Sequence, residues 1–170
     1  MADLNADLRA RIEEWIEGDP NRRDRDELRV LLELHVEHGN QAEELADRFS
    51  GRLVFGTAGL RGAIGAGPNR MNDAVVRQTT AGFADTLEAE VPDARSRGVV
   101  IGFDARRRSE DFAREAASVL MARGFVVHAW DRPTPTPTTP FMVKRLGAAA
   151  GLQITASHNP PQDNGYKVYW

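Results

Sequence analysis

From residue 53 onward, this chain alternates short apolar runs with segments of helical periodicity. Residues 99–103, 125–130 and 148–155 have the length and composition of buried strands. Between them lie two segments with apolar side chains at helical spacing, the first of which Ser109 is expected to cap. Strands that alternate with helices of this length predict parallel crossover units. We therefore expect the α/β class, as a three-layer α/β/α fold with a largely parallel, mixed sheet.

The segment before this alternation is rich in glycine. Residues 53–55 have the composition of a short strand, and five glycines between Gly56 and Gly67 then predict a loop that can approach a ligand closely. Asn72 or Asp73 is expected to cap the helix that follows. The glycine segment is thus predicted to join the first strand of the domain to its first helix.

Residues 1–50 have a different pattern. Apolar side chains recur at helical spacing, and turn sequences at residues 18–20 and 39–40 divide the segment into three helices. Charged residues cover the other faces, which is typical of a solvated helical layer. We expect this amino-terminal helical leader to pack on one domain formed by residues 51–170, because a chain of 170 residues favours a single core.

Charge and composition argue against several classes of partner. The formal net charge is −3, so no general attraction to nucleic acid or to an anionic membrane is expected. No apolar run approaches the roughly 20 residues that cross a bilayer, and the charged start lacks the apolar segment of a secretory signal. The chain has no cysteine, which excludes thiolate metal sites and fits a cytoplasmic location.

Residues 155–161, Thr-Ala-Ser-His-Asn-Pro-Pro, are the most informative stretch for chemistry. The stretch follows an apolar strand, so Ser157 is expected at the carboxyl end of that strand, where open α/β sheets bind ligands. A serine hydroxyl needs an activating base or conversion to a phosphoester before it reacts. A hydrolase with His158 as base is one interpretation, but neighbours on a tight loop rarely meet and the Gly-x-Ser-x-Gly elbow is absent. A serine that only caps a turn is the structural alternative.

Other polar residues are predicted to join this loop around a phosphate. Thr57 and Arg61 lie in the glycine segment, where backbone N–H groups and a guanidinium can bind phosphate oxygens. Arg106 follows a predicted strand and can reach the same edge of the sheet, whereas the arginines next to it are expected to be solvated. Asn159 precedes a proline, a pattern that is also common in turns for conformational reasons alone.

Lys167 comes ten positions after Ser157. Asn164 and Gly165 form a dipeptide that favours tight reversals, and a turn there would bring the lysine back beside the serine on an adjacent strand. A lysine in that position can act in proton transfer. The alternative is a strand lysine whose stem lies along the surface.

Several segments together resemble a known family. Residues 155–160 resemble the active-serine signature of the α-D-phosphohexomutase superfamily, which includes phosphoglucomutases and phosphomannomutases. Residues 55–62 resemble the amino-terminal substrate loop of that family, and residues 102–106 with 133–135 resemble its strand end and proline turn. The resemblance runs from about residue 53 to residue 170, and the leader is similar to the branch related to phosphopentomutases.

The resemblance implies an isomerase that transfers a phosphoryl group within a hexose phosphate, through a phosphoserine and a bisphosphorylated sugar. It implies Mg²⁺, bound through the phosphate on Ser157, and a bisphosphorylated sugar such as glucose 1,6-bisphosphate as activator. Lys167 would be the general acid/base. The residues assigned to catalysis by the resemblance are Ser157, His158 and Lys167, and those assigned to substrate binding are Thr57, Arg61, Asn159 and Arg106.

The metal loop, sugar loop and final phosphate loop of that family do not occur in this sequence, and residue 170 falls inside a strand-like run. We therefore expect a truncated first domain, inactive alone, whose partners are a sugar phosphate and the remaining domains of the same enzyme. A phosphopentomutase or an aminosugar phosphomutase of the same superfamily stays open, because the missing sugar loop selects the sugar. A non-catalytic module that binds sugar phosphates is a further interpretation.

Overall fold

The computed structural model describes residues 4–170 and contains a five-stranded mixed sheet in the order β1-β5-β4-β2-β3. β2 pairs in parallel with both β3 and β4, while β5 pairs antiparallel with β4 and with β1. The strands are β1 (Leu60–Ala63), β2 (Val99–Phe103), β3 (Val127–Ala129), β4 (Ala150–Ile154) and β5 (Asp163–Tyr169). The expected mixed sheet is confirmed, and its parallel part is limited to three of the five strands.

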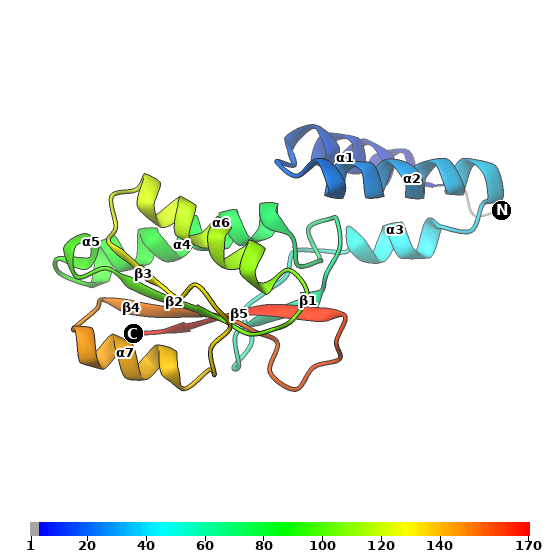
Figure 1. Cartoon of the computed structure of the whole chain (residues 1–170). Coiled ribbons are helices and arrows are strands. Elements are labelled where there is room, and N and C mark those ends of the chain that lie inside the picture. Colours follow the sequence, from blue (N-terminus) through cyan, green and yellow to red (C-terminus); the bar gives the residue numbers. More distant parts are fainter. Residues whose placement is uncertain (1–3) are drawn as a thin grey trace.

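Helices cover both faces of the sheet (Figure 1). α4 (Asp73–Glu90) and α6 (Ser109–Ala122) lie on one face and α7 (Thr138–Leu146) lies on the other, while the short α5 (Ala94–Arg97) leads into β2. This arrangement confirms the α/β class and the three-layer fold. α7 packs mainly on β2 and β4, and β1 and the second half of β5 are only partly buried. The two edges of the sheet, at β1 and at β3, are therefore less buried than its centre.

The first strand differs from the expectation. Residues 53–55 are extended but belong to no strand, and β1 forms inside the glycine segment instead. Gly62 explains this placement, since a Cβ atom there would lie 2.9 Å from Cδ2 of Leu53. The Leu53 side chain thus packs directly over β1. Glycine in this segment allows close packing on a strand rather than replacing the strand with a loop.

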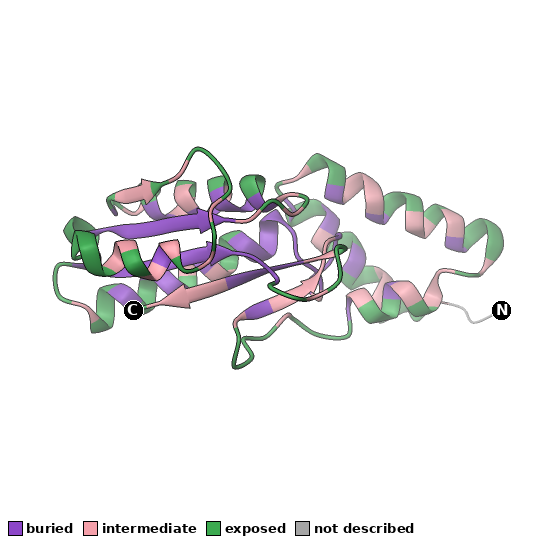
Figure 2. Cartoon of the chain, turned by 60° about the horizontal axis from the view of Figure 1, so that its bottom comes forward, coloured by how far each residue is buried: buried purple, intermediate pink, exposed green. Residues whose placement is uncertain are grey.

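The main hydrophobic core lies between the sheet and helices α4 and α6. β2 and β4 are buried along their whole length (Figure 2). Phe112 from α6, Leu152 from β4 and Tyr166 from β5 are fully buried in this core. The hydroxyl of Tyr166 lies 3.0 Å from Oγ1 of Thr80 on α4, so its polar atom has a partner. β5 is therefore anchored to α4 by packing and by a buried hydrogen bond.

Two helix starts show how local sequence acts here. Asn72 caps α4 as predicted, because its side chain accepts a hydrogen bond from the backbone N of Val75 at 2.9 Å. The prediction for α6 is wrong. The cap position is Arg108, with a left-handed φ of 63°, and Ser109 is the first helical residue. The Ser109 hydroxyl instead donates to Oδ1 of Asp104 at 2.6 Å, which ties the start of α6 to the end of β2.

The leader forms a separate helical layer. Its helices are α1 (Ala6–Gly18), α2 (Arg22–His38) and α3 (Ala42–Arg48). Ile12, Leu28 and Leu45, one from each helix, are fully buried in a second core that also contains Phe49 and Ala66. Residues 1–3 of the expected leader lie outside the described residues. The boundary at residue 50 stays a prediction, since this second core draws on both sides of it.

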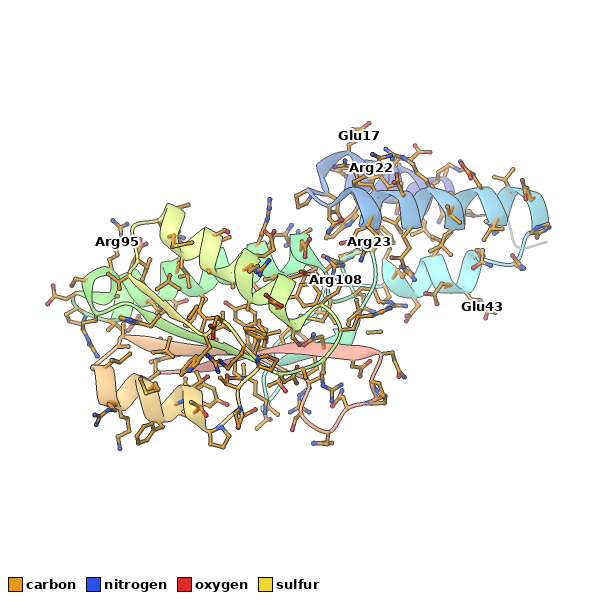
Figure 3. The ribbon with its side chains drawn as sticks, viewed as in Figure 1. Glu17, Arg22, Arg23, Glu43, Arg95 and Arg108 are labelled. Carbon is orange, nitrogen blue, oxygen red and sulfur yellow. The ribbon has the colours of Figure 1, made fainter. Side chains whose placement is uncertain are left out.

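Arg108 joins the leader to the domain (Figure 3). Its Nη1 lies 3.0 Å from Oδ1 of Asp24 on α2, and its Nη2 lies 2.7 Å from Oδ1 of Asp73 at the start of α4. The three side chains are at most 10% exposed. Burial raises the pKa of Asp24 to about 6, because desolvation outweighs the attraction to Arg108. The leader is thus attached through a buried group of charges.

Candidate active site

The serine motif forms the loop between β4 and β5, at residues 155–162. Ser157 is exposed and has a φ of 59°, in the left-handed region that residues other than glycine rarely adopt. Thr155 is buried, and its Oγ1 accepts a hydrogen bond from the backbone N of Ser157 at 2.9 Å. An unusual backbone conformation held by its surroundings is common at functional sites. Ser157 therefore stands accessible at the carboxyl end of a strand, as its sequence position predicts.

The side chain of Arg106 reaches from the segment after β2 to the serine loop. Its Nη2 donates to the backbone oxygens of Ser157 at 2.7 Å and Asn159 at 2.8 Å. Its Nη1 donates to the backbone oxygens of Pro160 at 2.8 Å and Asp163 at 3.2 Å. The Arg106 side chain is only 17% exposed. The structure thus brings Arg106 to the serine loop, with its donors on the backbone of that loop.

A second set of hydrogen bonds links the glycine segment to the serine loop. Arg61 on β1 donates from Nη1 to Oδ1 of Asn159 at 3.0 Å, and Nδ2 of Asn159 donates to Oδ2 of Asp163 at 2.9 Å. Nη2 of Arg61 lies 3.4 Å from the backbone oxygen of Ala58. Nε of Arg61 is buried and has no hydrogen-bond partner among residues 4–170. Arg61 therefore lies between the two loops with donor capacity left for an anion.

Lys167 and Thr57 line a neighbouring cavity. Lys167 lies opposite Gln153 in the register of β4 and β5. Its stem packs beside Gly59, where a Cβ atom would lie 3.0 Å from Cγ of Lys167. The cavity has a volume of about 320 Å³ and is lined by residues 55–59 and 167–169. In its wall, burial raises the pKa of Tyr169, so this phenol stays neutral at physiological pH.

The reversal before Lys167 is not where the sequence predicted it. Asn164 and Gly165 belong to β5, and residues 155–162 make the turn instead. The Asn164 side chain is fully buried and donates to the backbone oxygen of Arg107 and to the hydroxyl of Ser109 at the start of α6, which holds this position inside the strand. Lys167 consequently lies opposite Gln153 on β4, and Gln153 is four residues before Ser157. Among residues 4–170, no hydrogen bond joins the side chains of Lys167 and Ser157.

His158 is exposed at the tip of the same loop. Its Nδ1 lies 3.4 Å from Oγ of Ser157, which is too long for a strong hydrogen bond. Within the described part of the chain no carboxylate hydrogen-bonds to His158, so the arrangement of a Ser-His-Asp hydrolase is not formed. The structure therefore gives no support to the interpretation that His158 activates Ser157 as in a hydrolase.

The predicted residues thus fall into two adjoining parts. The hydrogen-bonded part contains Ser157, Asn159, Arg61 and Arg106, the cavity contains Thr57 and Lys167, and His158 lies at the rim. Sequence reasoning missed Thr155, Asp104 and Asp163, which hold the backbone or side chains of these residues. A threonine two residues before the serine and an aspartate two residues before the arginine were the available signals, since both spacings favour local side chain to backbone bonds.

A sequence model described as phosphoglucomutase/phosphomannomutase, alpha/beta/alpha domain I, matches residues 52–170. The chain belongs to the α-D-phosphohexomutase superfamily. The matched residues correspond to the amino-terminal domain of that superfamily and include all five strands, the glycine segment and the serine loop. We call residues 52–170 the phosphohexomutase domain.

Curated relatives of this phosphohexomutase domain have related names. The phosphopentomutase of Homo sapiens is 45% identical over 163 residues, which cover 92% of this chain and 26% of the relative. The probable phosphoribomutase of Schizosaccharomyces pombe is 44% identical, and the match covers 96% of this chain and 27% of the relative. The glucose 1,6-bisphosphate synthase of Homo sapiens is 41% identical, and the match covers 94% of this chain and 26% of the relative. The chain spans about a quarter of the length of these relatives.

A solved structure shares the fold. The crystal structure of a putative phosphomannomutase from Thermus thermophilus matches 70% of this chain and 26% of its own chain, with a TM-score of 0.61 and 34% sequence identity. Within residues 4–170, no helix is long and apolar enough to cross a membrane.

Proposed function

We propose that this phosphohexomutase domain carries the phosphoserine of a phosphosugar mutase, an isomerase that moves a phosphoryl group between two hydroxyls of one sugar. The observation that supports this proposal most is Ser157, which is accessible and left-handed, in a loop that two arginines contact: Arg106 at the Ser157 carbonyl and Arg61 at the Asn159 side chain. Phosphorylation adds a charge of about −1.5 to −2. These guanidinium groups would lower the energy of that charge in a cleft.

The proposed reaction has two transfers that balance. In the first, a hydroxyl of the sugar attacks the phosphorus on Ser157, the bond from phosphorus to Oγ breaks, and the sugar becomes a bisphosphate. The proton of the attacking hydroxyl passes to Lys167, and Oγ regains a proton, with His158 at 3.4 Å placed to assist. In the second transfer, Oγ gives up its proton and attacks the other phosphorus of the bisphosphate, the bond from that phosphorus to the sugar oxygen breaks, and Lys167 returns its proton to this oxygen. This restores the phosphoserine and releases the isomeric monophosphate.

The cavity lined by residues 55–59 and 167–169 is proposed to receive the sugar phosphate. Arg61 has a buried Nε without a partner and lies between the serine loop and the glycine segment. The backbone around Thr57 and the amide of Asn159 are further proposed contacts. A phosphate between these groups would lie within reach of both parts of the site, which is what in-line transfer requires.

The proposal includes Mg²⁺, with a phosphate oxygen on Ser157 as one ligand. In the described residues there is no group of three His, Asp or Glu side chains that could hold a metal ion. Residues 4–170 therefore do not form a metal site by themselves, and we propose that the ion takes its other ligands from the remaining domains of the enzyme. We further propose that these domains are its main partners, that the enzyme acts in the cytoplasm, and that this chain alone does not turn over substrate.

A pentose phosphate is the substrate that we propose. Curated relatives at 44% and 45% identity are named phosphoribomutase and phosphopentomutase. A hexose phosphate is the second candidate, because the family model and the solved structure carry the names phosphoglucomutase and phosphomannomutase. A relative named glucose 1,6-bisphosphate synthase supports a bisphosphorylated sugar as intermediate or activator.

Mass spectrometry of the intact protein tests the covalent step. We expect phosphate on the peptide that contains Ser157, and we expect Ser157→Ala to lose that phosphate and all mutase activity. Ser118→Ala is a matched control, since Ser118 is exposed on α6 and outside the site. Full activity of Ser157→Ala would refute the proposed role. Assays with pentose 1-phosphates and hexose 1-phosphates identify the sugar, and a preference for hexose would overturn only the substrate.

A further inference from the structure

The terminal nitrogens of Arg106 have no donor left for a substrate. A guanidinium group carries five N–H bonds. Its two terminal nitrogens donate four hydrogen bonds to backbone oxygens of the serine loop, at distances of 2.7 to 3.2 Å. Its Nε lies 3.3 Å from Oδ2 of Asp104. The four donors of the terminal nitrogens therefore all have acceptors among the described residues, and Nε faces a carboxylate, so a sugar phosphate could bind the outer end of this guanidinium only if some of these contacts broke.

The same contacts fix the backbone of Ser157 on both sides. Nη2 of Arg106 binds the carbonyl oxygen of Ser157 at 2.7 Å, and Oγ1 of Thr155 accepts from its N–H at 2.9 Å. A left-handed conformation at a serine persists only where the surroundings hold it. Of the two hydrogen bonds that hold the Ser157 backbone, the one from Arg106 has a charged donor, and such bonds are stronger than those between neutral groups.

Arg106 is itself held in place. Oδ1 of Asp104 accepts from the backbone N of Arg106 at 3.0 Å and from the hydroxyl of Ser109 at 2.6 Å. Nδ2 of Asn164 donates to that same hydroxyl at 2.9 Å. These bonds connect the end of β2, the start of α6 and β5. The guanidinium therefore acts from a fixed point of the fold rather than from a mobile side chain.

We propose that Arg106 is a positioning residue, which holds Ser157 in the orientation for phosphoryl transfer and does not bind the sugar phosphate. The proposal rests on the proposed role of Ser157 as the phosphoryl carrier. It replaces the substrate contact that the resemblance suggested for Arg106. Arg61 is the better substrate arginine, because its Nη1 and Nη2 each donate only one hydrogen bond within the described structure and keep a second donor.

The test compares Arg106→Gln and Arg106→Lys with Arg107→Gln in the intact protein. Arg107 is the exposed neighbour, and its side chain makes no hydrogen bond or ion pair with any described residue. Arg106→Lys keeps the charge but can donate at most three hydrogen bonds, and it serves if the glutamine variant does not fold. Hydrogen exchange of the peptide that spans residues 155–163, the melting temperature, kcat and KM are measured for each variant.

For both Arg106 variants we expect exchange in the loop to accelerate by about tenfold or more, while exchange in the core helices is unchanged. We expect kcat to fall about 100-fold, because a small displacement of a reacting group has an effect of that size. KM should change by less than about threefold, since ground-state binding is kept. Arg107→Gln should match the wild type in all four measurements.

A rise in KM with unchanged loop exchange would show that Arg106 binds substrate and would overturn the proposal. Unchanged kcat and unchanged exchange would overturn it as well. The proposed function fails separately, if the intact wild-type protein shows no mutase activity on any sugar phosphate. In that case loop exchange still decides whether Arg106 orders the serine loop.

Discussion

Asp24→Asn is expected to stabilise the protein at neutral pH, although it removes one carboxylate from a buried ion pair. Asp24 is 1% exposed and binds Arg108, which also binds Asp73. Burial, followed by repulsion from Asp19 and Asp73, outweighs the attraction to Arg108 and raises the pKa of Asp24 from 3.8 to about 6. Three carboxylates thus repel one another within one poorly hydrated region. Asparagine at position 24 removes one of these charges, while the 2.7 Å contact between Arg108 and Asp73 remains.

The size of the effect follows from proton binding. The folded protein binds the Asp24 proton more tightly than the unfolded chain, so this group's contribution to stability is complete below about pH 4 and is lost as the pH rises through about 6. The difference in pKa corresponds to about 3 kcal/mol of unfolding free energy above pH 7. Asparagine resembles the protonated carboxyl in shape and has no charge to desolvate, so it avoids this loss.

Urea unfolding followed by tryptophan fluorescence measures the effect. At pH 7.5 we expect Asp24→Asn to be more stable than the wild type by about 3 kcal/mol, and at pH 5 by about half of that. Asp26→Asn is the matched control on the same helix, because Asp26 is half-exposed and its surface ion pairs contribute less than about 1 kcal/mol. A less stable Asp24→Asn at pH 7.5, or an advantage that stays the same at pH 5, would refute the reasoning.

Two further substitutions test the sheet and the site. Gly165→Ala should lower the melting temperature and reduce the free energy of unfolding by about 2 kcal/mol or more, because the added Cβ atom would lie 2.6 and 2.7 Å from two backbone oxygens. Gly82→Ala on α4 is the control, since the added atom there meets open space and should be neutral or stabilising. Equal effects of the two substitutions would contradict this packing. Lys167→Met should lower kcat at least about 100-fold with a smaller change in KM. Lys144→Met on α7 is the control and should leave both constants unchanged. A normal kcat in Lys167→Met would show that Lys167 is not the acid/base.

Periodicity predicted the regular part of the fold well. The strand expected at residues 99–103 is β2, and Asn72 caps α4 as expected, because both depend on local sequence alone. The start of β1 could not be predicted. It depends on Leu53 packing over Gly62, and no sequence pattern shows which side chain will occupy the space that a glycine leaves. The turn assigned to Asn164 failed for a similar reason, since its buried side chain is bonded to a distant segment.

Motifs indicated that Arg61 and Arg106 can reach the serine loop, but not how their side chains are bonded there. Arg61 and Asn159 are 98 positions apart in sequence and meet at 3.0 Å, as two motifs of one family would suggest. Arg106 is different, because its acceptors are backbone oxygens of residues 51 to 57 positions away. A carbonyl group is the same in every residue, so the sequence holds no signal that would reveal such a partner. The structure is needed to separate a ligand contact from a contact with the loop.

Two of the three arginines in residues 104–108, the connection between β2 and α6, point in different directions. Arg106 reaches the serine loop, and Arg108, two residues later, reaches the leader and the start of α4. Both depend on the exact number of residues between β2 and α6. An insertion or deletion of one residue here would misdirect both side chains at once, so we expect the length of this connection to vary far less among homologous proteins than its exposed side chain, Arg107.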